Sequence, residues 1–396
     1  MSQLAASPSN NLNKLRCARP LLLRALLLRA FLACCFALGM LTEATSAEGQ
    51  WQGVERIVAI GDVHGEYTNF LALLREAELV NRRGNWIAGT THLVQLGDIP
   101  DRGPDTDKVI KLLKQLEIQA EKAGGKVHVL IGNHEAMNML GDLRYVDPGE
   151  LAALRTRDSR RLRDAFYEQE VARRVAADPE FVADEIFRKQ WEKEVPLGLI
   201  EHRRAWGPTG EFGAWVLQHN AVIRINRNLF LHAGISPQIV GMSATQINEQ
   251  IRQELRNGLG TEPGLSERED GPLWYRGLAT NDETIELAHV DRVLAAYDVD
   301  RIIIGHTPGL ATVVPRFAGK VLVVDAGLSA YYGSHRAALL LEKDQLETDQ
   351  VTTLQRGSRV SVPQSTEGLL AYFQQIAELE PEVPALQERI NSLQSQ

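Results

Sequence analysis

The sequence predicts an α/β fold, and two observations support this prediction. Short apolar runs end at Gly followed by a polar residue in four segments, at 56–62, 92–98, 127–133 and 301–306. Runs of this length and composition are typical of buried strands. Helical patterns lie between them, for example at 105–123, so strands and helices alternate along the chain. Polar side chains then stand at the strand ends, where open α/β sheets carry their functional sites.

The first 47 residues differ from the rest and predict a cleavable export signal. Basic residues precede a Leu-rich run, and the apolar stretch 30–41 ends close to the small residues 44–47. Only about a dozen apolar residues are uninterrupted, against the roughly 20 that a bilayer span requires. No stable membrane span is therefore expected, and an anchor is the less favoured alternative. We expect an exported protein, periplasmic or secreted in a bacterium and otherwise delivered to an organelle or endomembrane lumen.

The cysteines and the charge exclude several classes of function. Cys17, Cys34 and Cys35 all lie in the leader, so the mature chain would hold no thiol. This excludes a disulfide framework, cysteine catalysis and thiolate metal sites. The leader also holds 5 of the 43 basic and 1 of the 51 acidic residues, which leaves a formal net charge of −12. That charge argues against nucleic acid as a partner.

The remaining chain divides into a catalytic region at 48–345 and a peripheral C-terminal extension at 346–396. Within the catalytic region, residues 142–215 are rich in Arg, Glu and Asp at helical spacing. They predict a helical insertion over one edge of the core, and a solvated helical pair without a role in recognition is an equal alternative. Further strands are expected at 221–225, 229–232, 313–315, 321–325 and 337–341.

Six oxygen and nitrogen donors stand at or just past the predicted strands. They are Asp62, His64, Asp98, Asn133, His232 and His306. A mixture of carboxylate, amide and imidazole donors suits divalent manganese, iron or zinc, and the sequence does not choose among these metals. One Asp-x-His pair would be weak evidence. Six donors at strand ends, most of them beside glycines, predict a site for two divalent metal ions.

The neighbouring residues add the groups that phosphate chemistry needs. A pair of cations lowers the pKa of water and stabilises charge on a phosphoryl group. His134 is placed to be the leaving-group acid, and Asp101 is a suitable partner to orient its imidazole. Arg102 and Arg276 can offer bidentate donors to phosphate. These features predict a phosphatase site.

Five ordered blocks resemble a known family. They are Gly61-Asp62-Val63-His64-Gly65, Gly97-Asp98-Ile99-Pro100-Asp101-Arg102-Gly103, Gly132-Asn133-His134-Glu135, Leu231-His232-Ala233-Gly234 and Gly305-His306. Together they resemble the phosphoprotein phosphatases of the calcineurin-like metallophosphoesterase superfamily. The resemblance covers about residues 57–333. It implies a four-layer αββα fold, in which helices flank a central mixed β-sandwich and loops on one edge hold the metals.

The resemblance also implies a role for each site residue. Asp62, His64 and Asp98 would hold one metal ion, and Asp98 would bridge to a second. The second ion would be held by Asp98 together with Asn133, His232 and His306. His134 would be the general acid with Asp101 behind it, and Arg102 and Arg276 would hold phosphate. The block around Arg276, Tyr275-Arg276-Gly277, is shorter and weaker than the others.

Finer features resemble the bacterial-type Shewanella-like protein phosphatases. These features are Ile99-Pro100 before Asp101, the run 135–146, the long insertion, Trp274-Tyr275-Arg276-Gly277 and Gly305-His306-Thr307-Pro308. Members of this branch act on phosphotyrosine as well as phosphoserine and phosphothreonine. Arg144, Arg203 and Arg204 are candidate substrate contacts, with structural salt bridges as the favoured alternative. Tyr331-Tyr332 either leans over the active-site rim or packs in the core.

We therefore expect a metal-dependent phosphoprotein phosphatase. It would hydrolyse phosphate monoesters by direct attack of a hydroxide that bridges two metal ions. The alternative is a nucleotide or dinucleotide polyphosphate hydrolase, which the presence of Asp101 behind the acid disfavours. A binding module without turnover is a further class, disfavoured because every ligand and the acid are present. The sequence predicts no oligomeric state.

Overall fold

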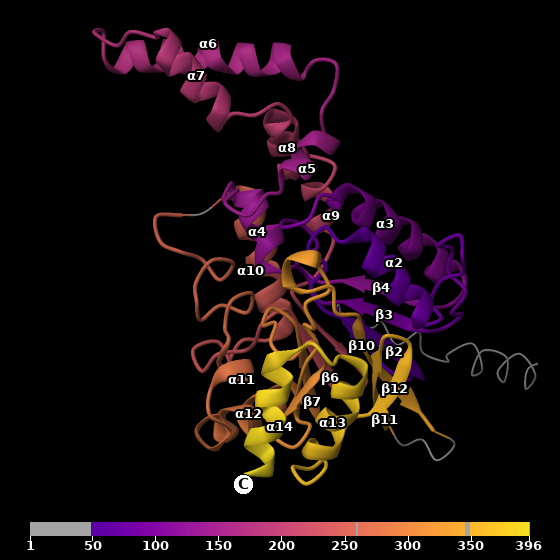
Figure 1. Ribbon diagram of the computed structural model, residues 1–396. Coiled ribbons are helices and arrows are strands. Elements are labelled where there is room, and N and C mark those ends of the chain that lie inside the picture. The colour runs from indigo at the N-terminus through magenta and orange to yellow at the C-terminus, as the bar shows by residue number, and fades with distance from the viewer. Residues whose placement is uncertain (1–48, 259, 345–348, 396) are drawn as a thin grey trace, which may run out of the picture. The chain divides into compact units, whose positions relative to one another are not determined.

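Two mixed six-stranded sheets form the centre of the protein (Figure 1). The computed structural model describes residues 49–258, 260–344 and 349–395. The predicted export signal at 1–47 therefore lies outside the described residues. Within the described ranges, no helix has the length and apolar character needed to cross a membrane.

The first sheet has the strand order β1-β5-β6-β7-β9-β8 and the second has the order β12-β11-β10-β2-β3-β4. The first consists of β1 (Gln50–Trp51), β5 (Val222–Ile225), β6 (Asn228–Leu231), β7 (Arg301–Ile304), β9 (Val321–Val323) and β8 (Val314–Arg316). The second consists of β12 (Ser358–Ser361), β11 (Asp349–Gln355), β10 (Ala337–Lys343), β2 (Arg56–Ile60), β3 (His92–Gln95) and β4 (Lys126–Val129).

Strand β2 shows why the central strands carry apolar side chains on both faces. Ile57 and Ala59 belong to the core between the sheets, whereas Val58 and Ile60 pack with the helices outside. Side chains alternate between the faces of a strand, so a strand covered on both sides is apolar at most of its positions. The outer helices are α2 (Tyr67–Glu76), α3 (Thr106–Lys122), α10 (Ala244–Asn257) and α12 (Glu283–Tyr297). The predicted α/β fold, with helices flanking a mixed β-sandwich, is confirmed (Figure 1).

The parallel strands set the position of the functional site. β2, β3 and β4 are parallel neighbours, with Ile57 opposite His92 and His92 opposite Lys126. Parallel strands need crossover connections, which α2 and α3 provide. The carboxyl ends of these strands consequently lie at one edge of the sheet, and the loops that follow them are neighbours.

The C-terminal region is more central than the peripheral extension expected at 346–396. β11 and β12 extend the second sheet, and α13 (Leu369–Leu379) and α14 (Pro384–Gln394) follow. Phe373 and Ile376 are fully buried in the core between the sheets. Apolar residues at helical spacing on α13 face this core, and the Gln and Glu residues between them obscure the pattern in the sequence.

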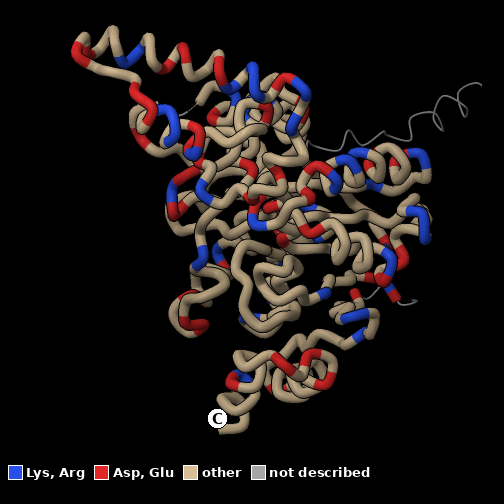
Figure 2. The backbone as a smooth tube through the Cα atoms, turned by 45° about the horizontal axis from the view of Figure 1, so that its top comes forward, with Lys and Arg blue, Asp and Glu red and all other residues tan. Residues whose placement is uncertain are grey.

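Helices occupy the region where the insertion was expected. They are α5 (Pro148–Ala153), α6 (Ser159–Ala177), α7 (Glu185–Glu194), α8 (Leu199–Trp206) and α9 (Gly213–Val216), after α4 (Asn133–Leu140). α6 and α7 pack through a small cluster of Tyr167, Trp191 and Val195. Acidic and basic residues are interspersed along this pair (Figure 2), and ion pairs such as Arg188 with Asp164 join the two helices.

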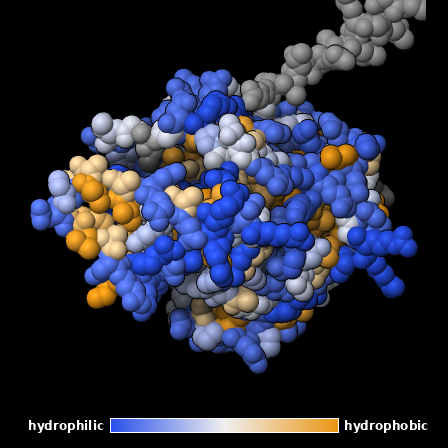
Figure 3. All heavy atoms as spheres, turned by 90° about the horizontal axis from the view of Figure 1, so that it is seen from above, coloured by the Kyte–Doolittle hydropathy of each residue, from blue (hydrophilic) through white to orange (hydrophobic). Residues whose placement is uncertain are grey.

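The helical pair also exposes apolar side chains. Val182, between the two helices, is 75% exposed, and Ile186 on α7 is 78% exposed. Hydrophobic side chains gather at one side of the face shown in Figure 3. Because the cluster between α6 and α7 is small, ion pairs between the two helices, such as Arg163 with Glu192, act together with this apolar cluster to hold the pair.

Candidate active site

The loops after five strands converge at one edge of the sandwich. Asp62 follows β2 and His306 follows β7 in the other sheet, and the backbone N–H of His306 donates to Asp62 Oδ1 at 3.0 Å. His232 follows β6, and its Nδ1 lies 2.7 Å from the carbonyl oxygen of Leu96, which follows β3. These contacts join the two sheets where their polar strand ends meet.

The structure brings all six predicted metal ligands together. The described residues contain two groups whose donor atoms lie within 4.8 Å of one another: His64, Asp98 and His134, and Asp98, His232 and His306. Asp98 belongs to both groups. Asp62 Oδ2 lies 3.7 Å from His64 Nε2. Asn133 Oδ1 lies 2.9 Å from His232 Nε2.

Three of these ligands have an unusual backbone conformation. His64, Asp98 and His306 have φ values of 48°, 58° and 66°. A non-glycine residue with positive φ is uncommon and persists only where its surroundings enforce it. The left-handed turns aim these side chains back toward the strand ends, and the neighbouring loops must hold the turns in place.

Glu135 is the group that holds two of these loops, and sequence reasoning gave it no role. Its carboxylate accepts the backbone N–H groups of Asp98 at 2.9 Å, Ile99 at 2.7 Å and Gly132 at 2.8 Å. Burial, followed by the charge of Asp98, raises the pKa of Glu135 to about 7. The only signal in the sequence was its place beside His134 in the block Gly132-Asn133-His134-Glu135. Glu135 links the loop after β3 to the start of α4.

A second carboxyl that the sequence did not indicate lies beside Asp62. Asp325 follows β9 and is buried, and burial raises its pKa to about 6. Burial also raises the pKa of Asp62 well above its ordinary value, and the charges of Asp325 and Asp98 raise it further. The signal that could have found Asp325 is the apolar run 321–324 that precedes it, which resembles the runs before Asp62 and Asp98.

Two of the three imidazole ligands, those of His64 and His306, are held in the form that binds metal. Burial lowers the pKa of His64 to about 3, and repulsion from His134 adds to this effect. Burial likewise lowers the pKa of His306 well below its usual range, with a contribution from His232. Both rings are therefore neutral at pH 7, as metal coordination requires. His306 Nε2 is buried and has no hydrogen-bond partner in the described chain.

The residues present fit divalent cations. Three carboxyl groups, those of Asp62, Asp98 and Asp325, are buried close together, an arrangement that is costly without a compensating positive charge. Neutral imidazoles and an unpartnered ring nitrogen add the donors that Mn²⁺, Fe²⁺ or Zn²⁺ prefer. The chemistry of this donor set supports metal binding and leaves the metal's identity open.

His134 and Asp101 lie beside the metal ligands as a buried pair. His134 Nδ1 makes a close hydrogen bond with Asp101 Oδ2. Asn138, one turn further along α4, donates to Asp101 Oδ1 at 3.1 Å. The other ring nitrogen of His134, Nε2, lies 3.8 Å from Asp98 Oδ2. The imidazole is therefore fixed at one nitrogen and presents the other to the ligand cluster.

The insertion holds the turn that carries Asp101 and Arg102. The backbone N–H of Asp101 donates to Glu150 Oε1 at 2.7 Å, and the N–H of Arg102 donates to the carbonyl oxygen of Tyr145 at 3.0 Å. Both turn residues have positive φ, 73° and 64°. Burial, followed by the charge of Asp101, raises the pKa of Glu150 well above its usual range. At least the first part of the predicted insertion is therefore built into the site.

Replacing Glu150 by Ala is expected to lower turnover of p-nitrophenyl phosphate by about 10-fold. The buried N–H of Asp101 would lose its acceptor, which costs about 1–3 kcal/mol in the free energy of unfolding or in the geometry of the turn. Glu150→Gln is the matched control, because its amide oxygen still accepts and burial favours an uncharged side chain. Steady-state kinetics and urea unfolding measure both effects. Equal turnover by the Ala and Gln variants would contradict this role.

The two predicted phosphate-binding arginines border the ligands. Arg102 Nη1 lies 3.0 Å from His64 Nε2. Arg276 Nη1 donates to the carbonyl oxygen of His306 at 2.7 Å and to Thr307 Oγ1 at 3.1 Å. Arg102 therefore contacts the ring of one histidine ligand, and Arg276 is anchored on the loop of another.

Three tyrosine rings surround Arg102. The Cζ atom of Arg102 lies 5.0 Å from the ring centroid of Tyr145, 5.3 Å from that of Tyr331 and 4.9 Å from that of Tyr332, within range of cation–π attraction. Tyr332 also hydrogen-bonds Arg102. The Tyr331-Tyr332 pair therefore lies at the rim of the site, which is one of the two positions that the sequence suggested, the other being the core. Among the candidate contacts of the insertion, Arg144 forms an ion pair with Asp142, as the salt-bridge alternative expected.

The chain is similar to known phosphoesterases and protein phosphatases. The family model for calcineurin-like phosphoesterases matches residues 55–310. An uncharacterized protein of Schizosaccharomyces pombe is 34% identical over 307 residues, which cover 74% of this chain and 79% of that protein. Shewanella-like protein phosphatase 2 of Arabidopsis thaliana is 27% identical, over 69% of this chain and 72% of its own length.

A solved structure is also similar. It is the cold-active protein-tyrosine phosphatase of a psychrophilic Shewanella species, with 28% identity, a TM-score of 0.60, and coverage of 79% of this chain and 82% of that chain. The family match spans more than half of the chain, and the relatives include named protein phosphatases. The chain is thus a metallophosphatase that belongs to the calcineurin-like phosphoesterase family, with Shewanella-like protein phosphatases among its relatives.

Proposed function

We propose that this enzyme is a phosphoprotein phosphatase that hydrolyses phosphate monoesters at a two-metal centre, with phosphotyrosine as the favoured substrate. The observation that carries the proposal is the position of Asp98, whose carboxylate is common to two groups of metal donors and faces His134 Nε2. The names of its relatives, protein phosphatases and a protein-tyrosine phosphatase, support the substrate class.

Metal binding and phosphate binding are divided among the chain's residues. Asp62, His64, Asp98, Asn133, His232 and His306 would hold two ions of manganese, iron or zinc. When bound, such ions supply Lewis acidity and lower the pKa of water. Arg102 and Arg276 bind the phosphoryl oxygens through paired N–H donors and orient the ester. Both arginines lie beside histidine ligands, so the phosphate would be held against the ligand cluster.

His134 supplies the proton that the reaction needs. As the bond between phosphorus and the leaving oxygen breaks and a water oxygen bonds to phosphorus, His134 Nε2 gives its proton to the leaving oxygen. One proton of the water stays on the phosphate product, and the other restores the protonated form of His134. Asp101 holds Nδ1 and stabilises the protonated ring before transfer. This is a direct hydrolysis without a covalent phosphoenzyme.

The tyrosines at the rim favour an aromatic phosphoester. Tyr145 lies over both Arg102 and His134, with its ring centroid 5.3 Å from that of the imidazole. A phenyl ring attached to the phosphate could stack among Tyr145 and Tyr332, which adds about 0.5–1.5 kcal/mol beyond burial of its area. A serine or threonine ester has no ring to use this surface.

A phosphopeptide panel tests the proposal against its nearest alternative. Purified enzyme is assayed with matched phosphotyrosine, phosphoserine and phosphothreonine peptides and with diadenosine tetraphosphate, in the presence of Mn²⁺, Fe²⁺ or Zn²⁺. We expect the highest kcat/KM with phosphotyrosine peptides. A strong preference for diadenosine tetraphosphate would instead assign the chain to the dinucleotide polyphosphate hydrolases.

A further inference from the structure

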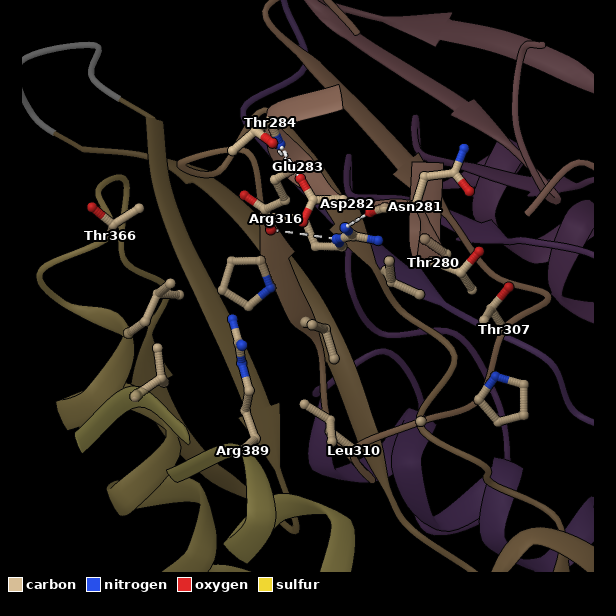
Figure 4. Close-up of a pocket in the computed structure, with 18 residues that line it drawn as sticks. Thr280, Asn281, Asp282, Glu283, Thr284, Thr307, Leu310, Arg316, Thr366 and Arg389 are labelled. Carbon is tan, nitrogen blue, oxygen red and sulfur yellow. Dashed lines mark hydrogen bonds and ion pairs between the residues drawn. The ribbon is translucent and has the colours of Figure 1, made fainter. Parts of the chain in front are cut away.

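A cavity of about 720 Å³ lies next to the loop of His306 and has no role in the proposed mechanism (Figure 4). Thr307 and the three residues after it form one wall. The other walls come from β8, from the segment 279–284 between the end of α11 (Gly277–Thr280) and the start of α12, and from α13 and α14. The C-terminal region, expected to be peripheral, thus helps to build a cavity beside the site.

The acidic groups of the cavity are already engaged. Asp282 Oδ1 accepts the backbone N–H of Thr284 at 2.8 Å, as the cap of α12. Glu283 accepts the N–H of Phe317 at 2.8 Å and Arg316 Nε at 3.4 Å. These contacts hold both carboxylates in place, and within the described residues neither forms an ion pair with Arg389.

One of the two arginines in the cavity has no such partner. Arg316 pairs with Glu283 and donates to the carbonyl oxygen of Asn281. Arg389, on α14, points into the cavity (Figure 4), and within the described part of the chain it makes no hydrogen bond or ion pair. Burial lowers the pKa of Arg316, and repulsion from Arg389 lowers it further. The cavity therefore holds two neighbouring cations, of which one is unpaired.

The remaining lining selects a ligand larger than an inorganic ion. Leu310, Pro315 and Leu393 add apolar surface on several sides of the cavity. A phosphate or chloride ion would leave these walls uncovered, whereas a peptide segment with a carboxylate would contact the walls and pair with Arg389. Arginine pairs with carboxylates through two parallel hydrogen bonds, which gives such a contact both strength and direction.

The cavity is connected to the phosphate-binding region through one residue. Thr307 lines the cavity, and its hydroxyl accepts a hydrogen bond from Arg276 at 3.1 Å. A peptide whose phosphate rests on Arg276 can therefore extend along Thr307 into the cavity. We propose that the cavity binds an acidic side chain of the phosphoprotein substrate through Arg389, so that the enzyme favours phosphorylation sites flanked by Asp or Glu. This inference rests on the proposed function.

The test compares two peptides on three enzymes. The peptides carry one phosphotyrosine and flanks of Asp on both sides, or the same flanks with Asn in place of Asp. The enzymes are the parent, Arg389→Glu, and Arg83→Glu as the control, since Arg83 is an exposed arginine in the loop after α2. p-Nitrophenyl phosphate, which has no flanks, reports whether each variant is folded and has an intact catalytic site.

We expect the parent to turn over the Asp peptide with a kcat/KM about 10-fold higher than the Asn peptide, as one charge-assisted pair provides. Arg389→Glu should remove or reverse this ratio, with p-nitrophenyl phosphate turnover unchanged, and Arg83→Glu should keep the ratio. The same ratio in parent and Arg389→Glu, or no ratio in the parent, would overturn the inference. Failure of the parent on every phosphopeptide, with p-nitrophenyl phosphate still hydrolysed, would instead overturn the proposed function and this inference with it.

Discussion

Replacing His134 by Asn is expected to lower kcat by about 10²- to 10⁴-fold, the usual contribution of a general acid. The substitution removes the nitrogen that faces Asp98 and leaves the backbone N–H of residue 134, which donates to Asp98 Oδ1 at 2.9 Å. The metal ligands and the arginines keep their partners, so phosphate should bind almost as well as before. Steady-state kinetics give kcat, and inhibition by inorganic phosphate gives the binding.

The leaving group distinguishes an acid from a merely structural histidine. p-Nitrophenolate leaves readily without being protonated. The phenolate of phosphotyrosine is a poorer leaving group, so its departure depends more strongly on a proton from the acid. The loss in His134→Asn should therefore be larger for a phosphotyrosine peptide than for p-nitrophenyl phosphate. An equal loss for both substrates, or near-normal rates for both, would remove His134 from the role of acid.

Much of the site could be predicted because its residues stand at strand ends. Asp62, Asp98 and Asn133 each follow an apolar run and a glycine, and parallel strands must bring such positions to one edge. Residue type then indicates the chemistry. Local sequence was sufficient here because strand, turn and donor are consecutive in the chain. The roles of these residues in catalysis stay predictions.

The supporting residues could not be predicted in the same way. Glu135 and Glu150 act by accepting backbone N–H groups from other loops, 36 to 49 positions away in sequence. Which N–H groups are left without partners depends on the turns at Asp98 and Asp101, and these turns have positive φ at non-glycine residues. No periodicity or composition encodes that geometry. A charged residue on a helix is ordinarily taken to be exposed, whereas Glu150 is 3% exposed.

The C-terminal region was misjudged for a related reason. Val351, Thr353 and Gln355 lie on the same face of strand β11. Thr353 and Gln355 are polar, yet both are fully buried. Thr353 shares a hydrogen bond with the hydroxyl of Tyr372, and Gln355 Nε2 donates to the carbonyl oxygen of Ala311 at 2.9 Å. Buried polar residues with partners look like surface residues in the sequence, because the partners are distant.

Replacing Asp98 by Asn is expected to reduce the metal content of the purified protein below that of the parent. Turnover should fall by about 100-fold or more, because even the loss of a residue that only supports a metal ligand lowers metal affinity or activity by about 10- to 100-fold. Asp98 is the one residue common to both donor groups found in the described chain. Asn is nearly isosteric and its oxygen can still accept the N–H of His134, so the change removes charge and leaves the loop's hydrogen bonds in place. Elemental analysis after dialysis measures the metal content, with Asp300→Asn as the control, because Asp300 is an exposed partner of Arg227.

Thermal unfolding provides a readout that does not depend on activity. A ligand that binds only the folded state raises the Tm, so added Mn²⁺ should stabilise the parent and Asp300→Asn more than Asp98→Asn. His134→Asn should show the full metal content and the full rise in Tm while its turnover is lost. Comparison of the two active-site variants thereby distinguishes the loss of proton donation from the loss of metal binding. If Asp98→Asn retained the metal content and the Tm response of the parent, Asp98 would not be a metal ligand, and the convergence of the six side chains would need another explanation.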